Sequence, residues 1–195
     1  LTSFLTGPRQ VGLSVLPFMK RPDPTRAYET SPKLQKAVDL LKTRLAADAR
    51  AKALVFSNYV GAGLGPYQAA LERDGIPSGV FHGGLTDAAR KKLVDDYNAD
   101  RIRVALLGPS GTEGLSFKGT RLLQRLDPHW HSVRGRQAEG RGVRMDSHLH
   151  LPVEDRSVTV QDFRSRLPGR TFGGPAPGVD GWMARRAEGR DRLNR

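Results

Sequence analysis

The stretch "KALVFSN", residues 52–58, decides the fold. After Lys52, the next four residues form a short continuous apolar run, which is typical of a strand buried on both faces of a sheet. The polar residues Ser57 and Asn58 follow the run directly. Further strands are predicted downstream at "SGVFH" (78–82), "VALLG" (104–108), "RLLQRLD" (121–127) and the alternating "RSVTVQDF" (156–163).

Helices are predicted between these strands. Ser31 and Pro32 are typical of an N-cap and a first helical position, and an apolar stripe with helical spacing continues to about Asp48. A second helix covers 66–74 and stops at Gly75, and a third, capped by Thr86 or Asp87, runs to about residue 98. The alternation predicts an α/β fold, an open parallel β-sheet with helices on both faces.

This unit is expected to occupy residues 31–167. Residues 1–30 carry prolines at 8, 17, 22 and 24, which predict an irregular segment connecting the unit to what precedes it. Residues 168–195 begin with a Gly- and Pro-rich linker and end in a basic tail. The chain begins with Leu1, which suggests a segment of something longer.

The composition is strongly basic. The 195 residues include 32 Lys and Arg against 20 Asp and Glu, a formal charge of +12 that favours polyanionic partners, nucleic acid first. No stretch approaches the roughly 18 apolar residues of a membrane span, so no membrane partner is expected. The absence of cysteine excludes disulfides and thiolate metal sites, and no signal peptide opens the chain. We expect a cytoplasmic protein, and the Arg, Gly and Ala content fits a bacterial, phage or viral source.

Polar segments follow the strands where ligands bind in parallel sheets, at the carboxyl ends. "GPSGTEG" (108–114) could cradle a phosphate with its backbone N–H groups, or could be no more than a glycine-rich turn. "DPHWHS" (127–132) follows the fourth strand. Trp130 in it is interpreted as a packing residue, with base stacking as the alternative.

"QAEGRGVR" (137–144) places Gln137, Arg141 and Arg144 on one face of a helix. Its two glycines each cost about 1 kcal/mol in a helix interior. The paired guanidinium groups suit the charge of a transferred γ-phosphoryl group, and they suit a nucleic-acid backbone equally well. The segment alone leaves both readings open.

Two His-x-His pairs, 129/131 and 148/150, have the spacing of metal ligands on a strand. With no cysteine and no acidic residue placed to complete a site, histidines that form hydrogen bonds beside the sheet are the favoured reading, and no metal site is predicted.

The order of these pieces resembles the second RecA-like lobe of a superfamily 2 helicase, over about residues 31–166. "KALVFSNYV", "VALLGPSGTEGLSFKG" and "LDPHWHSVRGRQAEGRGVR" are similar to motifs IV, V and VI of that group. "DPHW" before "RQAEGRGVR" resembles the Swi/Snf-type translocases, and "MDSHLHLPVEDR" the poxvirus and giant-virus branch. "GLSF" replaces the more usual "GLNL".

The resemblance implies a role for each matching position. Arg141 and Arg144 would be arginine fingers on the γ-phosphate, supported by Gln137. Gly111, Thr112 and Gly114 would form the motif V loop at the nucleotide. Glu113 and Ser116 near it would contact the nucleotide or pass a signal to the nucleic-acid groove. Residues on the nucleic-acid path would be Ser57, Asn58, His82, Gly83, Arg90 and Ser110.

A complete ATP site needs more than this chain has. No lysine follows a glycine, so no P-loop is present, and no Asp-Glu-x-Asp/His run is present to hold magnesium. In the resemblance, ATP and Mg²⁺ are held mainly by a first RecA-like lobe of the same polypeptide. The isolated chain is therefore expected not to hydrolyse ATP.

Three readings of the function remain. The chain is the C-terminal lobe of an ATP-dependent helicase or translocase, with DNA favoured over RNA, or a non-catalytic nucleic-acid-binding module. A Rossmann-like enzyme is disfavoured, because "GPSGTEG" follows the third strand and not the first.

Overall fold

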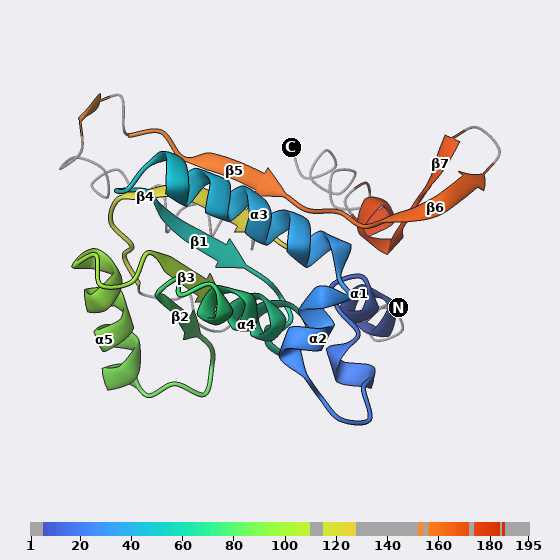
Figure 1. Cartoon of the computed structure of the whole chain (residues 1–195), viewed down its shortest axis with the longest axis horizontal. Coiled ribbons are helices and arrows are strands. Elements are labelled where there is room, and N and C mark those ends of the chain that lie inside the picture. The colour runs from blue at the N-terminus through green and yellow to red at the C-terminus, as the bar shows by residue number, and fades with distance from the viewer. Residues whose placement is uncertain are drawn as a thin grey trace, which may run out of the picture.

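The computed structural model describes residues 6–109, 115–127, 152–153, 156–171, 174–183 and 185. Its centre is a five-stranded sheet with the order β2-β3-β1-β4-β5, in which every neighbouring pair is parallel. The strands are β1 (Lys52–Phe56), β2 (Ser78–Phe81), β3 (Val104–Leu107), β4 (Thr120–Arg125) and β5 (Thr159–Asp162). This confirms the α/β fold predicted from the sequence (Figure 1).

Alternate residues of each central strand pack into two separate cores. Ala53 and Val55 of β1 pack in one core, with α3 (Pro32–Ala47) and α4 (Gly65–Arg73). Leu54 and Phe56 pack in the other, with α5 (Asp87–Asn98). Because side chains alternate across a strand, a run that is apolar at every position needs cover on both faces, and the sheet has it.

The helices begin where the sequence predicts. The Ser31 hydroxyl accepts a hydrogen bond from Leu34 N, and Pro32 occupies the first turn of α3. The Thr86 hydroxyl accepts from Ala89 N at the start of α5. Both caps satisfy N–H groups that have no partner inside the helix. A five-residue π-helical turn, Val60–Leu64, precedes α4 and was not predicted.

Residues 6–30 are more regular than the sequence predicts. They contain α1 (Thr6–Val11), a 3₁₀ turn η1 (Leu16–Phe18) and α2 (Pro24–Glu29). Three of the four prolines that suggested an irregular chain (8, 17 and 24) lie in the first turn of a helix, where a missing N–H costs nothing. Pro24, for example, follows Asp23, whose side chain caps α2 by accepting from Arg26 N.

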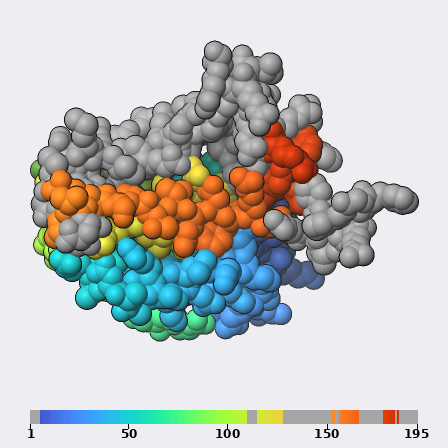
Figure 2. Space-filling view, turned by 90° about the horizontal axis from the view of Figure 1, so that it is seen from above, coloured from blue at the N-terminus to red at the C-terminus, as the bar shows by residue number. Residues whose placement is uncertain are grey.

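The region after residue 165 is also structured. β6 (Arg166–Thr171) and β7 (Gly174–Pro177) form an antiparallel pair, and residues 179–183 are helical. In the central sheet, the arrows of β1 and β5 point towards α1 and the helix at 179–183. These two helical segments therefore lie at the carboxyl edge of the sheet (Figure 1). From above, β5 runs beside α3 and the red helical segment lies near the start of α3 (Figure 2).

Candidate functional site

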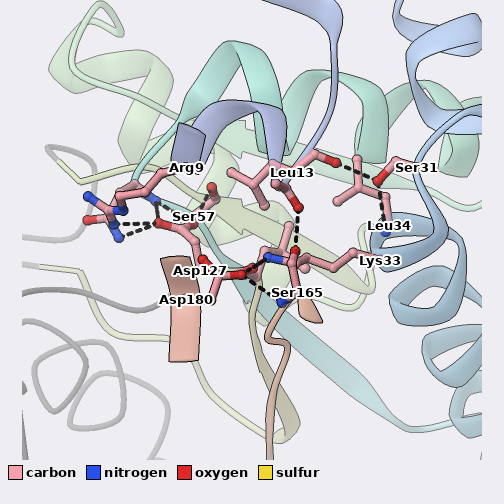
Figure 3. A network of polar contacts seen from close by, with 12 residues as sticks. Arg9, Leu13, Ser31, Lys33, Leu34, Ser57, Asp127, Ser165 and Asp180 are labelled. Atoms are coloured by element: carbon pink, nitrogen blue, oxygen red, sulfur yellow. Dashed lines mark hydrogen bonds and ion pairs between the residues drawn. The ribbon is translucent and has the colours of Figure 1, made fainter. Parts of the chain in front are cut away.

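The carboxyl ends of β1 and β4 meet because the two strands are neighbours in the sheet. Phe56 pairs with Arg125, and Leu126 N donates to Phe56 O over 2.9 Å just beyond the last pair. The pairing brings Ser57 and Asn58 next to Asp127, the first residue of "DPHW". Figure 3 shows this meeting point, with Ser57, Asp127 and Arg9 drawn as sticks.

Asp127 is a buried carboxylate that accepts hydrogen bonds from three residues. Ser57 Oγ donates to Oδ1 over 2.7 Å, and Asn58 donates from its backbone N over 3.1 Å and from Nδ2 over 2.6 Å. Arg9 Nη2 lies 3.4 Å from Oδ2. Burial raises the pKa of the Asp127 carboxyl, and the hydrogen bonds from Ser57 and Asn58 and the charge of Arg9 oppose that rise.

Ser57 is enclosed by the turn that it begins. The residue is fully buried, and Tyr59 N donates to its Oγ over 3.1 Å. A Cβ on Gly63 would lie 2.4 Å from that oxygen, so glycine permits the π-helical turn to pass this close. The hydroxyl predicted to touch nucleic acid is therefore occupied inside the protein, whereas Asn58 is half-exposed.

Arg9 enters this cluster from α1, outside the strands and loops that suggested a site. Its side chain is 8% exposed, and its guanidinium carbon lies 5.0 Å from the centroid of the Tyr59 ring. An arginine that pairs with a buried carboxylate and also lies over an aromatic ring contributes charge and packing together. Sequence reasoning missed both Arg9 and Asp127. The position of Asp127 at a strand end was a usable signal, but nothing marked Arg9.

The loop after β2 gathers the next group of predicted residues, His82, Gly83 and Arg90. His82 Nδ1 accepts from Gly84 N over 3.1 Å. Arg90 Nη2 reaches back from α5 and donates to Gly83 O over 3.3 Å. The structure thus brings these three residues together at the carboxyl edge of the sheet, with Gly83 exposed.

Ser116 lies elsewhere. Asn98, the last residue of α5, donates from Nδ2 to Ser116 O over 3.0 Å and accepts from Lys118 N through Oδ1 over 2.8 Å. The end of α5 leads into the beginning of β3, so Ser116 is anchored towards the amino edge of the sheet.

The remaining predicted site residues lie outside the described residues: Ser110, Gly111, Thr112, Glu113, Gly114, Gln137, Arg141 and Arg144. Trp130 and the histidines at 129, 131, 148 and 150 lie outside them too. Within the part of the chain that the structure describes, no group of three His, Asp or Glu side chains could hold a metal ion. Among those same residues, no helix has the length and apolar character to cross a membrane.

Comparisons with known proteins give this geometry a context. A protein of Acanthamoeba polyphaga mimivirus whose name describes an ATP-dependent RNA helicase is 27% identical over 140 residues, which cover 72% of this chain and 30% of that protein. Nucleoside triphosphatase I of Melanoplus sanguinipes entomopoxvirus is 32% identical over 87 residues, 42% of this chain and 13% of that protein. The chain thus spans less than a third of these relatives' length.

The fold has a solved counterpart. The crystal structure of the C-terminal part of the Fun30 ATPase domain superposes with a TM-score of 0.66 at 18% sequence identity, covering 88% of this chain and 48% of that one. The model of the helicase conserved C-terminal domain matches residues 32–146, from the first turn of α3 through the segment that carries Arg141 and Arg144. The chain therefore belongs to the helicase conserved C-terminal domain family.

Proposed function

We propose that this chain is the C-terminal lobe of an ATP-dependent nucleic-acid helicase or translocase and that it completes an ATP site held mainly by a first lobe. The observation that carries the proposal is the family match over 32–146, because that range includes both the Asp127 cluster and the "QAEGRGVR" segment. Related proteins named as an ATP-dependent helicase and a nucleoside triphosphatase support it.

In this proposal Arg141 and Arg144 act as arginine fingers. Guanidinium groups form strong, directed hydrogen bonds with phosphate oxygens and stabilise the charge that develops on a transferred γ-phosphoryl group. Gln137, four residues before Arg141 in the sequence, contacts the nucleotide or the motif V loop. That loop (Gly111, Thr112, Glu113 and Gly114) transmits nucleotide contact to the nucleic-acid path. Ser116, which Asn98 anchors towards the amino edge, supports the end of the loop.

The nucleic-acid path would follow the carboxyl edge of the sheet. Asn58, His82, Gly83, Arg90 and Ser110 are its proposed contacts. Ser57 takes a supporting part, since its buried hydroxyl bonds to Asp127 and so holds Asn58 in place. The formal charge of +12 favours a polyanion along this edge, and we propose DNA over RNA.

ATP with Mg²⁺ would enter the cleft between the lobes. The chain has no P-loop lysine, and the described residues include no acidic cluster that fits a metal. The first lobe would therefore supply the phosphate cradle and the magnesium ligands, and this lobe the fingers.

The test is Arg141→Ala in the full-length protein, with ATP turnover and nucleic-acid binding measured in parallel. Loss of an arginine finger lowers kcat by roughly 10³- to 10⁵-fold, and binding should change little. Arg26→Ala, at an exposed arginine of α2, is the control. Equal loss of turnover and binding, or binding without any turnover in the wild type, would favour the non-catalytic nucleic-acid-binding module. Parallel binding titrations with DNA and RNA identify which nucleic acid the protein prefers.

A further inference from the structure

Two segments outside the family match converge on two consecutive residues, Leu126 and Asp127, just after β4. Arg9 reaches Asp127 from the N-terminal side. Asp180 reaches Leu126 from the C-terminal side through Lys33. The matched family range begins at 32 and ends at 146, so it includes neither Arg9 nor Asp180.

The segment that carries α1 and η1, here called the N-terminal arm, is hydrogen-bonded to the rest of the lobe. Ser14 Oγ donates to Ala62 O over 2.6 Å, and the Ser31 hydroxyl donates to Leu13 O. These bonds fix the chain at Leu13 and Ser14, and Leu13 is 1% exposed. The side chains of Arg9 and Asp127 are 8% and 0% exposed, so water screens their interaction little.

The segment that carries Ser165 and Asp180, here called the C-terminal arm, is equally buried against the lobe. Lys33 Nζ lies 2.5 Å from Asp180 Oδ2 and donates to Leu126 O over 3.2 Å. Asp180 Oδ2 also accepts from Ser165 N over 2.8 Å. The side chains of Lys33 and Asp180 are 7% and 2% exposed, and Met183 in the same helical segment is fully buried.

The two arms touch each other as well. Ser165 Oγ donates to Gly12 O over 2.8 Å, which joins the segment after β5 to the end of α1. Figure 3 shows the chain of contacts from Arg9 and Asp127 to Ser165, Lys33 and Asp180. The end of β4 is thus held from both sides by one connected network.

Buried ion pairs of this kind add little net stability, because desolvation offsets most of the attraction. Their directed bonds do fix geometry. What they fix here is the point from which the chain continues into "DPHWHSVRGRQAEGRGVR", residues 127–144.

We infer that Arg9 and Asp180 are positioning residues: they fix the end of β4 from opposite sides, and that end is where the stretch of chain leading to Arg141 and Arg144 begins. This inference rests on the proposed function. It also means that the working lobe extends from α1 to the helix at 179–183, beyond the family match at both ends.

The test uses Arg9→Met and Asp180→Asn in the full-length protein, with steady-state ATP hydrolysis in the presence of nucleic acid. Arg26→Met and Asp39→Asn, at exposed residues of α2 and α3, are the matched controls. A misplacement of about 1 Å costs on the order of 100-fold in rate, so kcat should fall by roughly 10- to 100-fold in each variant. KM for ATP should stay within about twofold, because the first lobe holds most of the nucleotide.

Combination with Arg141→Ala separates positioning from a general structural role. If Arg9 acts through Arg141, adding Arg9→Met to Arg141→Ala should lower kcat no further, whereas independent effects would multiply. If Arg9→Met does not fold, Arg9→Gln takes its place in the same cycle.

Three outcomes are distinguishable. Unchanged kcat in the Arg9 and Asp180 variants, with Arg141→Ala inactive, overturns this inference and leaves the proposed function standing. A fall in kcat that only parallels a loss of folded protein, followed by circular dichroism, also overturns it. An active Arg141→Ala overturns the proposed function itself.

Discussion

The two edges of the sheet bury charged side chains with different sets of partners. At the amino edge, Lys52 Nζ donates to Tyr97 O over 3.1 Å and pairs with the Asp100 carboxylate at 2.7 Å. Arg121 pairs there with Asp48 at 2.7 Å. At the carboxyl edge, Asp127 takes Arg9 as its cation and Lys33 takes Asp180 as its anion.

The difference lies in where the partners come from. All the amino-edge partners belong to the matched range 32–146, so that edge is complete within the family domain. The carboxyl edge needs one residue from before the domain and one from after it. Ligands of parallel α/β sheets bind at the carboxyl ends of the strands. The edge that depends on residues from outside the matched range is therefore the one expected to bind ligands. Substitutions at the two edges should separate stability from activity.

Asp127→Ala should have the largest effect. It removes the Asp127 carboxylate from the buried Arg9 guanidinium and from Ser57 and Asn58, and removing one partner of a buried ion pair costs about 3–5 kcal/mol. We expect the free energy of unfolding to fall by about that amount in urea denaturation. Asp162→Ala is the control, because Asp162 pairs with Arg125 at a more exposed position and should cost at most about 1 kcal/mol. Equal losses in the two variants would contradict the larger cost that we assign to breaking the buried Arg9–Asp127 pair.

Gly63→Ala comes next. The new methyl group would meet Ser57 Oγ at 2.4 Å, and overpacking of this kind costs typically about 1–3 kcal/mol. Gly61→Ala, in the same π-helical turn, meets nothing within 4 Å and is the matched control. Thermal unfolding followed by circular dichroism should show a lower Tm for the first variant alone. The prediction fails if the two variants have the same Tm.

Lys52→Met tests the amino edge. The Tyr97 carbonyl oxygen loses the Lys52 donor but still accepts from Asp100 N over 3.2 Å, whereas the Asp100 carboxylate, 76% exposed, returns to water. One lost hydrogen bond costs about 0.5–1.5 kcal/mol, so stability should fall by about that amount. ATP turnover per folded molecule of the full-length protein should not change. A fall in kcat without a fall in Tm would show that the amino edge also affects the chemistry.

The smallest expected effect is on the pH dependence of stability, to which Asp127 and Asp96 contribute with opposite signs. The folded-state pKa of Asp127 is raised, mainly by burial. The folded protein therefore binds more protons than the unfolded chain between the ordinary aspartate pKa, about 4, and the raised value, and stability falls as pH rises through that window. The pKa of Asp96 is lowered, first by its hydrogen bond from Lys92 and then by that from Arg101, so its contribution is lost as pH falls.

Asp127→Asn should therefore flatten the dependence of unfolding free energy on pH above about 4, and Asp96→Asn the dependence below it. Urea denaturation at a series of pH values measures both slopes. The same change of slope in both variants would contradict the opposite shifts.

The sheet could be predicted from sequence because it depends on local signals. β3 is apolar at every position and β1 at every position after Lys52, and Ser31 and Thr86 mark the helix starts by side chains that can cap them. The structure confirms these elements to within a residue or two. Such patterns report the neighbours of a residue along the chain and the face on which it lies.

The Asp127 cluster could not be predicted in the same way. Arg9 and Asp127 are 118 positions apart, and nothing in "TGPRQV" marks its arginine for burial. Ser57 looked like a loop hydroxyl available to a ligand, because burial depends on the turn at Gly63 that passes over it. The prolines before residue 30 misled for a related reason, since their effect depends on whether each stands before a helix or at its start.

The strand order has a consequence for synthesis of the protein. β1 is made first, yet it lies between β3 and β4, which are translated several dozen residues later. At roughly 5–20 residues per second, this leaves β1 without partners on either side for several seconds. During that interval "ALVF" is an exposed hydrophobic segment of the nascent chain, so a chaperone that binds short apolar stretches would have a target there.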